Sequence, residues 1–119
     1  MSYFRFEDLE IWKSAIALGN GLFDVAERAA EKRLYRFAEQ LNGASISISN
    51  NIAEGSGSAS KKDFANYLMI ARKSLYECVN LLHVYQQRSL ISEEERDTLR
   101  LELLKLSRSI YAFRKKLLE

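Results

Sequence analysis

Apolar residues recur at alternating steps of three and four positions along most of this 119-residue chain. This spacing places them on one face of an α-helix, and each run is long enough to form the buried stripe of an amphipathic helix. The four stripes are Leu9, Trp12, Ile16, Gly19, Phe23 and Ala26; Leu34, Phe37, Leu41, Ala44, Ile48 and Ile52; Phe64, Leu68, Ala71, Leu75, Cys78, Leu82 and Tyr85; and Leu99, Leu103, Leu106, Ile110, Phe113 and Leu117. The pattern predicts four helices, and because the chain has no proline, nothing forbids long ones.

One stretch, Ser45–Ser49, alternates between serine and isoleucine as a half-buried strand would. In a helix Ile46 and Ile48 would point about 200° apart, so that Ile48 would extend the stripe that runs on to Ile52 while Ile46 faced elsewhere. The chain has no second strand-like run with which an isolated strand would pair. We therefore predict a helix through this stretch, held by tertiary packing because its residues have weak intrinsic helix propensity.

Serine and an acidic residue three positions apart mark the starts of two helices. Ser60 precedes Asp63, and Ser92 precedes Glu95. In such a capping box the serine accepts a hydrogen bond from a backbone amide of the first turn, and the acid returns one to the backbone of the serine. We therefore expect helices to begin directly after Ser60 and Ser92.

Breaks between helices are expected after the second and third apolar stripes. Gly55 and Gly57 are predicted to supply the left-handed backbone that ends the second helix, and the third helix is expected to end between Arg88 and Ile91. Short connections between long helices make successive helices antiparallel. The predicted fold is all-α: a single domain, residues 1–119, folded as an antiparallel up-down-up-down four-helix bundle.

The composition is that of a globular protein and excludes several kinds of site. Hydrophobic residues make up 47% of the chain and charged residues 29%, which is too apolar for a disordered chain. Cys78 is the only cysteine, so the chain forms neither an internal disulfide nor a cysteine-based zinc site, and its thiol is expected to be buried and unreactive. Because no apolar run reaches the length of a membrane span and the start resembles no signal peptide, we expect a cytoplasmic protein.

The second helix carries a sequence motif. Ser47-Ile48 followed by Asn51-Ile52-Ala53-Glu54-Gly55 resembles the signature Ser-Ile-Pro-x-Asn-Ile-Ala-Glu-Gly of the four-helix-bundle proteins named for open reading frames in intervening sequences of bacterial 23S ribosomal RNA. Further positions that match the family are Phe6, Leu9, Trp12, Ala15, Ile70, Ala71, Arg72, Ser74, Leu75, Tyr76 and Glu77. Ser49 stands where the family usually has proline, so we expect a weaker kink in the second helix, and Lys73 stands where it often has glycine.

This resemblance implies a bundle that assembles with copies of itself into a ring, typically a homopentamer. It also implies a distant similarity to accessory proteins of diversity-generating retroelements, whose basic rings engage nucleic acid and a reverse transcriptase. It does not imply an enzyme. The residues agree, because His83 is the only histidine and no second histidine or cysteine lies at ligand spacing, so we predict no catalytic site, no metal and no cofactor.

Two interpretations of the polar residues in the motif remain open. The polar group consists of Asn50, Asn51 and Glu54. Of these, Asn51 and Glu54 can satisfy backbone groups of the Gly55–Ala59 turn and of the start of the next helix, where amides need partners. Alternatively, these side chains form a ligand site. We favour the first interpretation, because helix ends need such partners in any protein.

Apolar residues outside the four stripes predict self-association. On the first helix they widen the apolar arc to about half of the circumference, and on the third and fourth helices they recur every seven residues. The residues that we predict at an interface with another copy are Leu18, Leu22, Val25, Met69, Tyr76, Leu104, Tyr111 and Leu118. The alternative is a thick core with scattered apolar residues on the surface.

Basic residues collect on the fourth helix, roughly opposite its apolar stripe. The predicted nucleic-acid-binding residues are Lys105, Arg108, Lys115 and Lys116, which fall within about 100° of one another, with Arg72 and Lys73 on the third helix. The formal net charge of +2 does not by itself indicate a nucleic-acid binder, but a ring would repeat these residues several times. Two hypotheses follow: a homo-oligomeric module that holds RNA or DNA by its phosphates, or a ring-shaped scaffold that recruits a partner protein without contacting nucleic acid.

Overall fold

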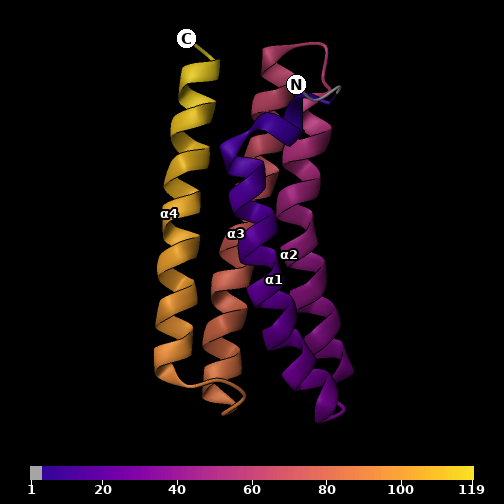
Figure 1. The fold of residues 1–119 in the computed structure, drawn as a ribbon, viewed down its shortest axis with the longest axis vertical. Coiled ribbons are helices and arrows are strands. Elements are labelled where there is room, and N and C mark those ends of the chain that lie inside the picture. The colour runs from indigo at the N-terminus through magenta and orange to yellow at the C-terminus, as the bar shows by residue number, and fades with distance from the viewer. Residues whose placement is uncertain (1–3) are drawn as a thin grey trace.

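Four long helices and one short 3₁₀ helix make up the computed structural model, which describes residues 4–119 (Figure 1). The elements are the 3₁₀ helix η1 (Arg5–Asp8), α1 (Glu10–Glu31), α2 (Tyr35–Ser56), α3 (Lys61–Gln87) and α4 (Glu93–Leu117). Within the described residues there is no strand. The predicted all-α class is confirmed.

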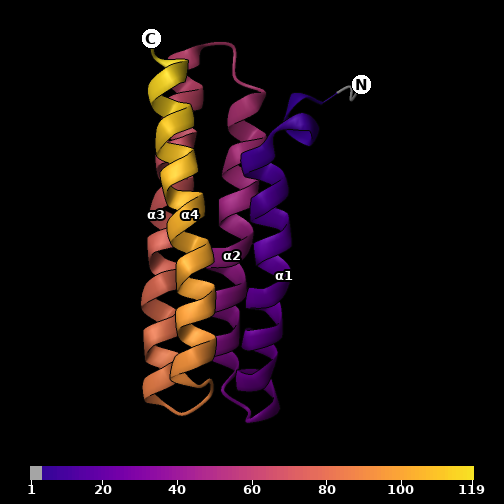
Figure 2. The same cartoon turned by 60° about the vertical axis from the view of Figure 1, so that its left-hand side comes forward.

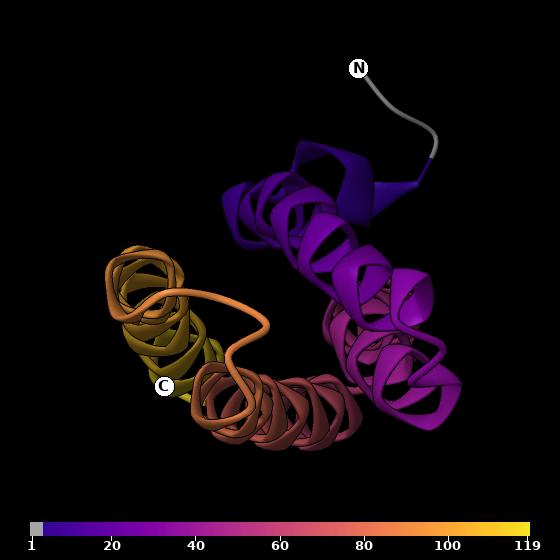
Figure 3. The ribbon, with the colours of Figure 1, turned by 90° about the horizontal axis from the view of Figure 1, so that it is seen from below.

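Helices that follow one another in sequence also lie side by side in space, each antiparallel to the one before (Figures 1 and 2). Seen along the bundle in Figure 3, the helices follow an arc from α1 through α2 and α3 to α4. The two ends of this arc, α1 and α4, pack least closely. This arrangement confirms the up-down-up-down bundle. None of the described helices combines the length and the apolarity that a membrane crossing requires.

Helix α2 runs without interruption through the alternating serines and isoleucines. Ile48 is buried with 2% of its surface exposed, whereas Ile46 is 44% exposed. Helical periodicity therefore decides the structure of this stretch, because it continues the buried stripe of Leu41 and Ile52. The predicted helix and the predicted difference between the two isoleucines are both confirmed.

Helix α1 faces the core with a different stripe from the one predicted. Ile16 and Phe23 are 41% and 37% exposed, while Leu22 and Val25, predicted at an interface with another copy, are buried in the core of the single chain. The buried residues of this helix are Ile11, Ala15, Gly19, Leu22, Val25, Ala26 and Ala29. Because apolar residues cover so much of this helix, the pattern alone did not show which flank faces α3 and α4.

Helices α3 and α4 begin where the sequence predicts, but the turn after α2 does not have the predicted left-handed glycines. The Ser92 and Glu95 side chains form a complete capping box at α4, and the Ser60 hydroxyl accepts a hydrogen bond of 3.1 Å from the Asp63 amide at α3. No described glycine has a positive φ, so Gly55 and Gly57 do not supply a left-handed end. Among residues 4–119, the residues with a left-handed backbone are Arg33, with φ of 63°, and Ser89, with φ of 59°, in the other two connections.

Gly55 instead allows α2 and α3 to approach each other closely. It is buried within α2, and a Cβ atom at this position would lie 2.6 Å from Cβ of Tyr67 and 2.9 Å from the Phe64 ring. Real Cβ atoms do not approach other atoms so closely. The glycine of the motif is therefore required by helix packing and not by a turn.

Candidate nucleic-acid interface

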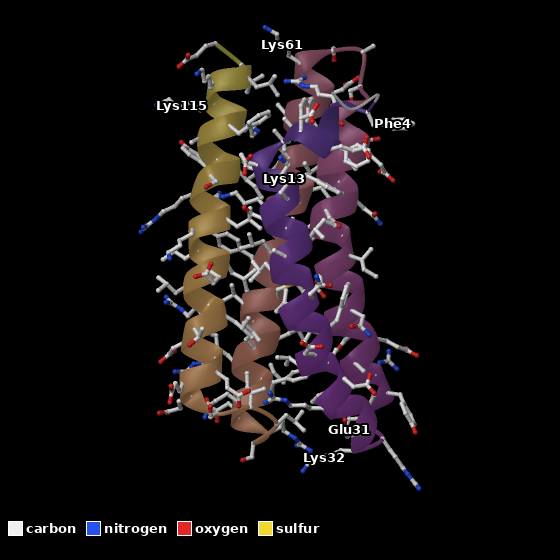
Figure 4. All side chains as sticks on the ribbon, viewed as in Figure 1. Phe4, Lys13, Glu31, Lys32, Lys61 and Lys115 are labelled. Atoms are coloured by element: carbon white, nitrogen blue, oxygen red, sulfur yellow. The ribbon has the colours of Figure 1, made fainter. Side chains whose placement is uncertain are left out.

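The predicted cations of α4 are all exposed. Arg108, Lys115 and Lys116 extend from the second half of the helix, which carries no acidic residue between Lys105 and Leu118. Figure 4 shows that Lys115 lies at the same end of the bundle as Lys61, the first residue of α3. Both helices therefore contribute positive charge to this end.

Lys105 differs from the other predicted cations. Its ammonium group lies 3.5 Å from the carboxylate of Glu102, one turn earlier on α4. It also lines a groove between α1 and α4, to which neither Arg108 nor Lys115 contributes. An adjacent carboxylate partly neutralises its charge, so Lys105 contributes less to a phosphate-binding surface than the sequence suggested.

Arg72 lies between two tyrosines on the outer side of α3 and α4. Its guanidinium carbon is 5.4 Å from the ring centre of Tyr76 and 5.3 Å from that of Tyr111. The guanidinium also donates hydrogen bonds to the Ser107 hydroxyl, at 3.1 Å, and to the Tyr76 hydroxyl, at 3.4 Å. We call Arg72, Tyr76 and Tyr111 the tyrosine–arginine stack. Cation–π contacts and hydrogen bonds hold its arginine in one place.

Two hollows open beside this stack. The first, about 350 Å³, lies between α3 and α4, and Tyr76 lines it together with Asn80, His83 and Arg100. The second, about 230 Å³, lies beside the last turns of α4. Its lining residues are Tyr111, Arg114, Lys115, Leu118 and Glu119. Each hollow therefore has one tyrosine of the stack in its wall and at least one arginine.

Arg114 joins the basic end of α4 to α3. Its Nε donates a hydrogen bond of 3.1 Å to the backbone carbonyl of Ala65. Arg114 was not among the residues predicted from the sequence, because the residue to which it bonds lies 49 positions away. This contact fixes the height of α4 along α3, and with it the positions of Tyr111 and Lys115.

The predicted interface residues fall on three different surfaces. Met69, Tyr76, Leu104, Tyr111 and Leu118 lie partly or largely exposed on α3 and α4, where they share the outer side with Arg72 and Arg108. Leu18 lies in the groove of about 420 Å³ between α1 and α4, and Leu22 and Val25 are in the core. Lys73 is exposed on α3. The structure thus brings together residues that the sequence assigned to two different roles.

We call the outer surface formed by α3 and α4 the α3–α4 face. It is defined by Met69, Arg72, Tyr76, Leu104, Arg108, Tyr111 and Lys115. Tyr76 and Tyr111 are 59% and 53% exposed although they contact Arg72. The face therefore combines exposed aromatic rings with unpaired positive charge.

Asn51 and Ser47 of the motif form hydrogen bonds within the bundle. The Asn51 side-chain amide donates hydrogen bonds to the carbonyl and the hydroxyl of Ser47, at 2.8 and 3.0 Å, and the Ser47 hydroxyl lies 2.7 Å from that of Ser74 on α3. Asn51 therefore ties α2 to α3 through Ser47. The predicted hydrogen bonds of the Asn51 side chain to the turn after α2 are wrong, because the side chain points back along its own helix. Glu54 is exposed.

The surroundings of Cys78 and His83 do not indicate a reactive thiol or a metal site. Cys78 is buried in the core, and burial, with a smaller effect of the Glu77 carboxylate, raises the pKa of its thiol to about 12. A thiol with such a pKa is protonated and unreactive near neutral pH. His83 is exposed in the first hollow. Among residues 4–119, no three histidine, cysteine, aspartate or glutamate side chains gather as a metal site would require.

Comparison with known proteins agrees with the motif in α2. The model of the 23S rRNA-intervening sequence protein family matches residues 7–112. The chain belongs to this family. Its fold is also that of a crystal structure of a protein with unknown function from the S23 ribosomal protein family of Bacteroides thetaiotaomicron. The two structures agree with a TM-score of 0.82 over 88% of this chain and 98% of the other, at 18% identity, which shows a common fold alone. No curated protein matches the chain in sequence.

The family match covers only part of the candidate interface. Arg72, Tyr76, Arg108 and Tyr111 lie within the matched residues 7–112 of this 23S rRNA-intervening sequence protein, whereas Lys115 lies beyond them. The tyrosine–arginine stack is therefore part of the matched region. The last cations of α4 are a feature of this chain outside it.

Proposed function

We propose that this 23S rRNA-intervening sequence protein is a non-enzymatic, homo-oligomeric module that binds RNA or DNA in the cytoplasm. The observation that carries the proposal is the run of positive charge on the α3–α4 face. Arg72, Arg108 and Lys115 are there, and no carboxylate of the described residues 4–119 forms an ion pair with them. Unpaired cations on one face are the groups that hold nucleic-acid phosphates.

The helix dipole explains only part of this charge. Helix α4 has Glu93, Glu94 and Glu95 in its first turn and Arg114, Lys115 and Lys116 in its last, as expected for a helix that complements its own dipole. That effect fades within one turn and does not account for Arg108 or for Arg72 in the middle of α3. A phosphate-binding role accounts for both of these residues.

The first test measures binding and its dependence on salt. Fluorescence anisotropy with a labelled duplex DNA and a labelled single-stranded RNA, each of about 20 nucleotides, is expected to show binding that weakens steeply between about 50 and 200 mM salt. The variant Arg108→Gln/Lys115→Gln is expected to lower the salt slope on duplex DNA by about 0.9 for each lost phosphate contact.

A matched variant removes the same charge from the opposite end of the bundle. Lys32 and Arg36 are exposed where α1 ends and α2 begins, as Figure 4 shows for Lys32. The control Lys32→Gln/Arg36→Gln is expected to keep the slope of the unmodified protein. Equal slopes for the two double variants would mean that net charge alone is responsible. Absence of binding to either probe at about 50 mM salt would contradict the proposal.

Self-association is the second part of the proposal and rests on other surfaces. Ile16 and Phe23 on α1 and Ile46 on α2 are exposed. A Cβ atom at Gly19 would lie 3.3 Å from the Ser45 hydroxyl, which places Ile46 level with the interval between Ile16 and Phe23. We call Ile16, Phe23 and Ile46 the α1–α2 patch. The patch is apolar and exposed, and it belongs to α1 and α2, whereas the α3–α4 face belongs to the other two helices.

A groove elsewhere on α1 can receive such a patch. The groove between α1 and α4 has a volume of about 420 Å³, and small residues of α1, including Ala17 and Gly21, lie beside Leu18 and Leu99 in its wall. A patch on one copy and a groove on the next are the two different surfaces that a head-to-tail ring requires. The family resemblance suggests five copies. The same surfaces favour the alternative function, a ring-shaped scaffold for a partner protein without nucleic acid.

A further inference from the structure

The tyrosine–arginine stack and its two hollows offer more than charge to a nucleic acid. A surface that only holds phosphates needs flexible cations and no aromatic side chains. Here Tyr76 and Tyr111 contact one guanidinium and still expose 59% and 53% of their surfaces. Exposed aromatic rings beside cations are what single-strand-binding proteins use to stack unpaired bases.

The hollow beside Tyr76 has the walls that an unpaired base requires. Its lining combines the apolar residues Leu75, Val79 and Leu104 with Tyr76. The Asn80 amide and the Arg100 guanidinium are placed along the same hollow and can donate hydrogen bonds to base edges. Its volume of about 350 Å³ falls in the range of about 300 to 1,000 Å³ that is typical of pockets for small organic groups.

The position of Arg72 suits the phosphates between two bases. Both rings lie within 5.4 Å of its guanidinium carbon, and Ser107 fixes its Nε. An arginine that is already held in place loses little conformational freedom when a phosphate binds. Arg108 and Lys115, on the same face of α4, supply further positive charge beside Tyr111.

Resting on the proposed function, we infer that the α3–α4 face binds single-stranded nucleic acid, with unpaired bases stacked on Tyr76 and Tyr111 and a phosphate on Arg72. A duplex keeps its bases stacked on one another and presents mainly phosphates to this face, so it gains nothing from the rings. A second copy of the chain fits less well. A copy that packed against it with the same face would bury Arg72, Arg108 and Lys115 against their own equivalents, and burying unpaired charge is costly.

The experiment compares three labelled probes of about 20 nucleotides in anisotropy titrations at one salt concentration. They are a single-stranded oligodeoxythymidylate, the same length of backbone with abasic sites, and a DNA duplex. The expected order of affinity is single strand, then duplex, then abasic strand. The variant Tyr76→Leu/Tyr111→Leu keeps apolar bulk but removes both rings, and it is expected to bind the single strand at least tenfold more weakly. Its affinity for the duplex is expected to fall by a much smaller factor, because Ser107 still holds Arg72.

Tyr35 offers a matched control, because it is 58% exposed at the start of α2, at the opposite end of the bundle from Lys61 and Lys115. The variant Tyr35→Leu is expected to bind all three probes like the unmodified protein. If Tyr76→Leu/Tyr111→Leu keeps its affinity for the single strand while Arg108→Gln/Lys115→Gln loses it, the inference is wrong and the proposed function stands. Absence of all binding by the unmodified protein would overturn both.

A last measurement tests whether a second copy of the chain, and not nucleic acid, binds the α3–α4 face. Sedimentation velocity of Tyr76→Leu/Tyr111→Leu, without nucleic acid, is expected to give the same association state as the unmodified protein. Dissociation caused by this variant would assign the α3–α4 face to contacts between copies and overturn the inference. Circular dichroism of the same sample confirms that the helices are intact.

Discussion

Gly55 shows how a single residue sets the distance between two helices. From the sequence it was predicted to form a turn, because glycine commonly ends helices. In the structure it lies inside α2, where the Tyr67 and Phe64 side chains occupy the space that a Cβ atom would need. The motif Asn51-Ile52-Ala53-Glu54-Gly55 therefore has a packing role. The Asn51 side chain donates a hydrogen bond to Ser47 one turn earlier in α2, Ile52 is buried, and Gly55 allows α3 to approach closely.

Replacing Gly55 tests this role directly. Gly55→Ala is expected to destabilise the protein by about 1 to 3 kcal/mol, because the added methyl group overpacks the contact between α2 and α3. The measurement is the midpoint of urea unfolding. Gly43 is the matched control, since it also lies inside α2 but a Cβ atom added there would meet no other atom within 4 Å. Gly43→Ala is expected to stabilise by about 0.5 to 1 kcal/mol through helix propensity. A neutral or stabilising Gly55→Ala would contradict the packing role.

At the scale of the helix, the capping box of α4 links stability to pH. The Ser92 backbone amide donates a hydrogen bond of 3.1 Å to the Glu95 carboxylate, which also pairs with Arg28 of α1. The hydrogen bond from Ser92, followed by the interaction with Arg28, lowers the pKa of Glu95 below its ordinary value of 4.5. A lowered pKa means that the ionised carboxylate stabilises the fold above the unfolded-state pKa. This contribution is lost as the pH falls through the folded-state value.

Glu95→Gln measures this contribution. At pH 7 the variant is expected to melt at a lower temperature than the unmodified protein, and the difference is expected to shrink as the pH is lowered toward 3 and Glu95 becomes protonated. Thermal unfolding followed by circular dichroism at several pH values gives the comparison. Ser60→Ala is the control, because the Ser60 cap of α3 accepts a bond from a backbone amide and no carboxylate takes part. A difference in melting temperature between Glu95→Gln and the unmodified protein that stays constant with pH would rule out the ionised carboxylate as its cause.

The helices differ in how far the sequence predicted their buried faces. In α3 all the residues of the predicted stripe, from Phe64 to Tyr85, are buried, and most of the exposed residues of that helix are polar. In α1 the prediction placed Ile16 and Phe23 inside and Leu22 outside, the reverse of the structure. Periodicity identifies a helix and the apolar arc on its surface. When apolar residues cover half of the circumference, however, the positions of the other helices decide which part of the arc is buried.

For the whole molecule, the sequence predicted the residues of the candidate site but not the contacts between them. Arg72 and Arg108 were singled out as cations, and Tyr76 and Tyr111 as apolar surface, each from its own helix. Their contact depends on the height of α4 relative to α3, which the bond from Arg72 to Ser107 and that from Arg114 to Ala65 record. Helical periodicity carries no information on that height, so the stack was not predictable from the sequence.

Assembly is the property of the whole molecule that the α1–α2 patch is proposed to control. The unmodified protein is expected to sediment as a homo-oligomer well above its monomer mass of 13.7 kDa. Phe23→Asp/Ile46→Asp is expected to reduce it to monomers with unchanged helix content, because both side chains are already exposed to solvent in the single chain. Leu22→Asp is the contrasting variant: Leu22 is buried in the core, so an unpaired charge there is expected to unfold the helices as well. A monomeric unmodified protein at micromolar concentration would contradict self-association, and an oligomer that survives Phe23→Asp/Ile46→Asp would place the contact between copies on another face.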